Sequence, residues 1–179
     1  IRKRVFHIAD ATAGLQNEYI NTVSEDASGR VWLATEERGL GWMEGNHFLG
    51  VGRERGWGGQ NVLALSPDRQ DGVWLATAGQ GLWHWRDNRS SQLKPTPKLP
   101  AGSPRCLHVT QDGTLWVVLD DVALFSIANG ATQRHGPRNG LNTRRVRTIA
   151  EDTDGHLWAG GWRGDIWRFS DDRWEEMRP

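Results

Sequence analysis

The sequence predicts an all-β protein built from four copies of one unit, and three observations lead to this fold class. A tryptophan recurs at a constant interval of 42 residues, at Trp32, Trp74, Trp116 and Trp158. The phrase around it repeats too: "SEDASGRVWLAT" at 24–35 returns as "SPDRQDGVWLAT" at 66–77, "VTQDGTLWVV" at 109–118 and "AEDTDGHLWAGG" at 150–161. No segment keeps apolar residues at helical spacing for ten residues, because glycine and aspartate interrupt each one. Four short strands per 42 residues is the size of a β-propeller blade, so we expect four four-stranded antiparallel blades.

The first unit shows the expected order of strands. We expect strands at 19–25, 30–35, 40–43 and 47–52, separated by turns rich in acidic residues and glycine. Aspartate accepts hydrogen bonds from backbone amides two residues on, and glycine takes positive φ, so an Asp-Gly phrase between apolar runs closes a hairpin. We assign this role to Asp26 with Gly29, Asp71 with Gly72, Asp112 with Gly113, and Asp154 with Gly155.

The repeat divides the chain into one short leader and four blades. Residues 1–13 are expected to hold an outer strand of a preceding blade, "RVFHIA" at 4–9, and the loop that leads into the first blade. The blades are then expected at 14–55, 56–98, 99–138 and 139–179. The third is the irregular one: it lacks the Gly-Leu pair that opens the first and fourth units, and the proline-rich stretch 95–104 predicts an extended loop before it.

The recurrent tryptophans have two possible roles. Sheets that pack face to face around an axis need a bulky side chain on each second strand to fill the wedge between neighbours, whereas an exposed ring can stack on a ligand. The regular placement favours packing, so Trp32, Trp74, Trp116 and Trp158 are predicted to lie between blades.

Composition and motifs argue against several classes of partner. The 22 basic and 22 acidic residues balance, so no nucleic-acid partner is expected, and no apolar run approaches the roughly 20 residues that span a bilayer, so no direct membrane contact is expected. A single cysteine, Cys106, excludes an intrachain disulfide. The six histidines lack metal-ligand spacing, the acidic turns lack the oxygen pattern of an EF-hand, and no phosphate-binding glycine motif is present, so we predict neither a metal nor a cofactor.

Two stretches resemble a known repeat family. "GLQNEYINTVSEDASGRVWLATEERGLGWMEGNHF" at 14–48 and "GLNTRRVRTIAEDTDGHLWAGGWRGDIWRFSDDRW" at 140–174 are similar to the two-component regulator propeller repeat. The resemblance implies a seven-bladed propeller in the extracytoplasmic sensor half of bacterial hybrid histidine kinases, several of which sense oligosaccharides. It therefore implies a periplasmic or other extracytoplasmic location. Four units fall short of seven, so the chain is expected to be part of a propeller, completed by the remaining blades, or half of an eight-bladed ring closed by a second copy.

Candidate binding residues lie on the loops that enter each first strand and join each second strand to the third, because these loops share one rim. We predict ligand-binding roles for Tyr19, Glu37, Arg38, Gln80, Arg105, Asp121, Arg144, Trp162 and Arg163. Arginine, carboxylate and amide groups beside an aromatic ring suit an oligosaccharide or another small polar ligand. We expect no enzymatic activity. Two alternatives stay open: an interaction propeller without a small ligand, and a streptogramin-lyase-like enzyme, which would need a His/Glu pair although no rim loop offers a histidine.

Overall fold

The fold is all-β, as the repeat predicts. The computed structural model describes residues 11–15, 19–36, 39–52, 57, 61–141 and 146–177, and within them sixteen strands form four antiparallel four-stranded sheets. Blade 1 contains β1 (Ile20–Glu25), β2 (Val31–Thr35), β3 (Gly39–Glu44) and β4 (His47–Gly50); blade 2 contains β5 (Val62–Pro67), β6 (Val73–Thr77), β7 (Gly81–Arg86) and β8 (Arg89–Leu93). Blade 3 contains β9 (Pro104–Val109), β10 (Leu115–Leu119), β11 (Ala123–Ala128) and β12 (Ala131–His135); blade 4 contains β13 (Val146–Glu151), β14 (Leu157–Gly161), β15 (Ile166–Ser170) and β16 (Arg173–Met177). Two 3-10 turns, η1 (Ala11–Ala13) and η3 (Pro137–Asn139), precede blades 1 and 4. The strand expected at 4–9 lies outside the described residues.

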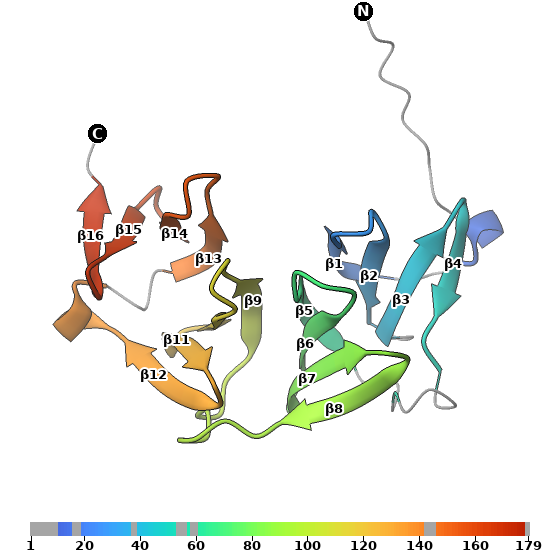
Figure 1. Cartoon of the computed structure of the whole chain (residues 1–179), viewed down its shortest axis with the longest axis horizontal. Helices are drawn as coiled ribbons and strands as arrows, with labels where there is room; N and C mark the ends of the chain where they lie inside the picture. The colour runs from blue at the N-terminus through green and yellow to red at the C-terminus, as the bar shows by residue number, and fades with distance from the viewer. Residues whose placement is uncertain are drawn as a thin grey trace, which may run out of the picture.

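The four blades follow an open arc (Figure 1). Each sheet is a meander in sequence order, with its first strand on the inner edge of the arc and its last strand at the periphery. The inner strands β1, β5, β9 and β13 contact one another from blade to blade. Blades 1 and 4 end the arc, so each has one face that no other described blade covers.

The hydrophobic core lies in the interfaces between blades. The recurrent tryptophans lie on the same face of each blade, which in blades 1 to 3 is the face toward the next blade along the chain. Trp32 is fully buried in a cluster formed by blades 1 and 2, and Trp116 is buried in a cluster formed by blades 3 and 4. Trp74 is half-buried and packs against the cluster of blades 2 and 3. Trp158 is half-buried on the free face of blade 4, because its neighbours in β14, Leu157 and Ala159, point into the interface with blade 3.

A buried aspartate closes the first hairpin of blade 1 and fixes the tryptophan. Asp26 Oδ1 accepts hydrogen bonds from the backbone amides of Ser28 at 2.9 Å and Arg30 at 3.0 Å. Its other oxygen accepts a bond of 2.7 Å from Trp32 Nε1. Burial acts to raise the pKa of Asp26, but the hydrogen bonds from Ser28, Trp32 and Arg30 outweigh it and lower the pKa below its usual value.

The equivalent aspartates in blades 2 and 4 stand six residues before the tryptophan, not beside the turn glycine. Asp68 accepts the amides of residues 70 and 72, and Asp152 accepts those of residues 154 and 156. Asp152 also accepts Trp158 Nε1 at 2.8 Å. Our assignment of Asp71 and Asp154 to this role is therefore wrong: the carboxylate must precede the turn to reach two of its amides, and those two residues lie within it.

Blade 3 departs from this arrangement. Thr110 occupies the position of the aspartate, and its hydroxyl bonds to Asp112 Oδ1 at 2.6 Å and to the carbonyl of Thr114 at 3.1 Å. Trp116 Nε1 is buried without a hydrogen-bond partner among the described residues. The sheet still forms because backbone bonds close the hairpin, with the Thr110 amide donating to Thr114 O at 3.0 Å.

Candidate functional site

The upper rim is the edge of the arc where each first strand begins and each second strand ends. Backbone bonds of 2.8–3.0 Å join the two loops in blades 1 to 3, from Glu36 to Tyr19, from Ala78 to Asn61 and from Asp120 to Ser103. The antiparallel pairing of the first two strands places these loops side by side. Polar side chains from neighbouring blades therefore converge at this edge.

Four side chains of blades 3 and 4 form a connected group on this rim, which we call the rim cluster: Arg105, Asp120, Arg147 and Trp162. Asp120 accepts a hydrogen bond from Arg105 Nη2 on one oxygen and from Arg147 Nη1 on the other. The Arg147 guanidinium carbon lies 4.6 Å from the centre of the Trp162 ring, within cation–π distance. A carboxylate thus holds two guanidinium groups, and one of them, that of Arg147, lies beside an aromatic face.

The rim cluster is accessible yet fixed in place. Trp162 is 67% exposed, whereas the side chains of Arg147 and Asp120 are only 24% and 21% exposed. The hydrogen bond from Arg105 lowers the pKa of Asp120, and the same bond raises the pKa of Arg105, so both groups stay charged near neutral pH. Arg147 Nε is buried and has no hydrogen-bond partner in the described part of the chain.

The rim cluster arises from the repeat itself. Arg105 and Arg147 are the second residues of β9 and β13, and Asp120 and Trp162 directly follow β10 and β14, so each pair occupies equivalent positions 42 residues apart. Sequence reasoning chose Arg105 and Trp162 but missed Arg147 and preferred Asp121 to Asp120. The 42-residue interval from Arg105 is the signal that identifies Arg147.

The other predicted rim residues lie apart from this group or outside the described residues. Asp121 and Arg163 are exposed in the turns next to it. Tyr19 is 72% exposed on blade 1. Glu37, Arg38 and Arg144 lie outside the described residues.

Gln80 lines a cavity of 1010 Å³ between blade 2, the loop 94–103 and the adjoining ends of β9 and β10 in blade 3. Its backbone carbonyl accepts hydrogen bonds from Trp83 Nε1 at 3.2 Å and Gln92 Nε2 at 2.9 Å. The structure thus divides the predicted rim into at least two distinct places, the rim cluster and this groove.

One group of metal-ligand type occurs among the described residues, at the opposite edge. Ligand atoms of Asp152, Asp154 and His156 lie within 4.8 Å of one another. Both oxygens of Asp152 are already used by the hairpin, one by two backbone amides and the other by Trp158 Nε1. The group is accounted for by hairpin closure.

The fold and the repeat define this chain as an open segment of a β-propeller with a polar, aromatic rim. The model of the two-component regulator propeller repeat matches residues 14–37 and 140–163, which confirms the resemblance in the first and fourth units.

Solved structures share the fold at low sequence identity. The extracellular domain of a putative hybrid two-component system from B. thetaiotaomicron is 20% identical, with a TM-score of 0.68 over 91% of this chain and 25% of that one. Virginiamycin B lyase from Staphylococcus aureus is 15% identical, with a TM-score of 0.67 over 89% of this chain and 55% of the lyase. The WD40 propeller domain of Doa1 is 12% identical, with a TM-score of 0.66 over 88% of this chain and 53% of that one. The chain therefore spans between a quarter and just over half of these proteins.

No curated protein matches the chain. Among the described residues, no helix is long and apolar enough to cross a membrane.

Proposed function

We propose that the chain is a non-enzymatic sensor module of a bacterial two-component signalling protein, and that it binds an oligosaccharide or another small polar ligand on its upper rim. The rim cluster carries the proposal. Its charged groups are already positioned by one another, and pre-positioned groups lose little conformational freedom when a ligand binds.

The chemistry of the rim cluster suits a sugar. Guanidinium and carboxylate groups form paired hydrogen bonds with vicinal hydroxyls, while the exposed face of Trp162 offers a flat apolar surface to a sugar ring. The repeat family supports a signalling role, and the similarity to the extracellular domain of a putative hybrid two-component system supports a location outside the cytoplasm. The lyase alternative is disfavoured because none of the rim loops contains a histidine in the sequence.

Calorimetric titration with a panel of neutral and acidic oligosaccharides tests the proposal. We expect one sugar to bind the chain, and Trp162→Ala to weaken that binding at least about fivefold, because stacking on an aromatic ring contributes about 1 kcal/mol or more. The matched control is Leu49→Ala, which removes an exposed apolar side chain from the outer strand β4 of blade 1 and should leave sugar binding unchanged. No binding at millimolar sugar, together with retained affinity for a protein partner, would favour the interaction propeller instead.

We also propose that the two free faces of the arc are covered by blades of the same repeat. These blades belong either to the rest of the same propeller or to a second copy of the chain. On blade 4, Ile166 is 46% exposed, although the equivalent residues in the other blades are buried: Leu40, Leu82 and Leu124. On blade 1, Val23 is 59% exposed, although its equivalents Leu65, Leu107 and Ile149 are buried. The free face of blade 4 thus resembles the side that each blade presents to the next blade, and the free face of blade 1 resembles the side that each blade presents to the one before. The two free faces are therefore complementary to each other.

A further inference from the structure

The groove between blades 2 and 3 lies where a repeated packing feature is lost. In the interface of blades 1 and 2, the connecting segment places Trp57, fully buried, in the same cluster as Leu40. In the interface of blades 3 and 4, Leu141 is fully buried in the cluster that contains Leu124. These two residues fill the space beside the start of the third strand of the preceding blade.

The connecting segment 94–103 does not fill the equivalent space beside Leu82. It offers Leu99, which is only half-buried against the core of blades 2 and 3. The segment is held outward on blade 3, because the Thr96 amide donates to Gly130 O at 2.8 Å and its carbonyl accepts the Thr132 amide at 2.9 Å. A cavity of 1010 Å³ remains, which is the size of a site for a small organic molecule.

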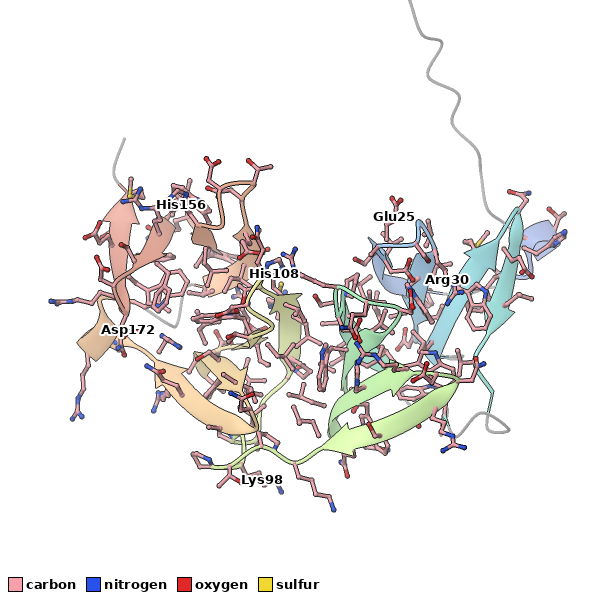
Figure 2. The ribbon with its side chains drawn as sticks, in the orientation of Figure 1. Glu25, Arg30, Lys98, His108, His156 and Asp172 are labelled. Carbon is pink, nitrogen blue, oxygen red and sulfur yellow. The ribbon has the colours of Figure 1, made fainter. Side chains whose placement is uncertain are left out.

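The lining combines apolar walls with one sign of charge. Leu82, Leu93, Leu99 and Leu119 contribute apolar surface, together with several prolines. Lys94 and Lys98 are the charged lining residues, and the lining, all within the described residues 61–141, contains no aspartate or glutamate. Two of the three lysines in the sequence therefore flank one groove, and Figure 2 shows Lys98 on the loop at the periphery of the arc.

We infer that this groove is a binding site for an organic anion with an apolar body, such as a medium-chain aliphatic or aromatic carboxylate. The apolar part lies against the leucines, where it displaces water from apolar surface. The anionic end lies between Lys94 and Lys98, which are exposed and can move to meet it. No residue of the rim cluster lines the groove, so this inference does not depend on the oligosaccharide proposal.

The test compares a charged and a neutral probe of similar shape. The fluorescent anion 8-anilinonaphthalene-1-sulfonate is titrated into the chain, with neutral N-phenyl-1-naphthylamine as its counterpart and octanoate as a competitor. Double substitution Lys94→Gln/Lys98→Gln is expected to weaken the anion about tenfold, since each exposed charge pair contributes up to about 1 kcal/mol, and to leave the neutral probe unchanged.

A matched pair of substitutions controls for net charge. Arg89→Gln/Arg138→Gln removes two exposed positive charges outside the groove and is expected to change the affinity less than about twofold. Amide shifts on addition of octanoate should include Gly81 and Gly102, which line the groove. Equal effects of the two double variants, or shifts confined to the free faces around Val23 and Ile166, overturn the inference. Neither double variant alters the rim cluster, so loss of anion binding with intact sugar binding separates the two proposals.

Discussion

Replacement of Thr110 by aspartate should stabilise the protein, because it supplies the acceptor that Trp116 lacks. In blades 1 and 4 the residue six positions before the tryptophan is an aspartate that accepts the indole N–H at 2.7–2.8 Å. In blade 3 that residue is Thr110, and Trp116 Nε1 is buried without a partner among the described residues. An aspartate at position 110 would stand two residues before Asp112. Blade 4 already contains this spacing, in Asp152 and Asp154.

The expected gain follows from the bonds exchanged. A hydrogen bond between the buried indole and a carboxylate contributes about 2–3 kcal/mol, and loss of the Thr110 hydroxyl, whose single proton is shared between Asp112 Oδ1 and Thr114 O, costs about 1–2 kcal/mol. Thr110→Asp should therefore raise the free energy of unfolding by about 1 kcal/mol. The reverse change, Asp26→Thr, leaves Trp32 Nε1 and two amides without this acceptor and should cost about 2–4 kcal/mol.

Urea unfolding followed by circular dichroism measures both changes, and the exchange rate of the Trp116 indole proton reports the new bond directly. We expect slower exchange of that proton in the Thr110→Asp variant. A loss of stability in Thr110→Asp, or an Asp26→Thr variant as stable as the parent, would show that the aspartate position does not contribute as argued.

Three further predictions concern the interface of blades 3 and 4. His135 is buried, its Nδ1 accepts Trp174 Nε1 and its Nε2 bonds to Ser126, and burial lowers its pKa from 6.5 to about 4. Because the unfolded state then binds the extra proton, stability should fall by up to about 3 kcal/mol between pH 6.5 and pH 4, and urea titrations of His135→Asn should lack this slope. Trp116→Ala should cost about 3–5 kcal/mol as a large aromatic truncation, and a loss below about 1 kcal/mol would mean that Trp116 is not a core residue. Gly140→Ala should destabilise the protein by more than 1 kcal/mol, because φ is +84° and the added Cβ meets Trp174 O, whereas Gly130→Ala, with positive φ but open space, should cost less in the same assay.

The fold could be predicted because the same pattern of strands and turns occurs four times in the sequence. The interval between Trp32, Trp74, Trp116 and Trp158 specifies the blade, and the alternation within each strand specifies its two faces. The turn residues were harder to assign: Asp71 and Asp154 stand next to glycine and match the usual hairpin phrase, while the carboxylates that bind the turn precede it.

The candidate site could be predicted only in part. Arg105 and Trp162 were chosen because they lie beside the rim loops, and the 42-residue interval from Arg105 would also have identified Arg147 at the second position of β13. A single sequence does not show that Arg147 reaches Asp120 of the neighbouring blade. The missing Gly-Leu pair and the proline-rich stretch indicated an irregular third blade with an extended loop before it, which is where the groove lies. Its volume and its pair of lysines depend on the hydrogen bonds of Thr96 to β12, which no local pattern reveals.

Light scattering across a concentration series tests most directly the claim that blades 1 and 4 carry complementary, unfilled halves of an interblade interface. With no other blades to cover them, we predict that two copies of this chain associate head to tail, giving twice the mass of the chain. Ile166→Asp should shift the protein to a monomer, whereas Leu49→Asp, which alters an exposed leucine on the opposite face of its blade from Val23, should not. A strict monomer at every concentration, or equal behaviour of the two variants, would contradict the claim.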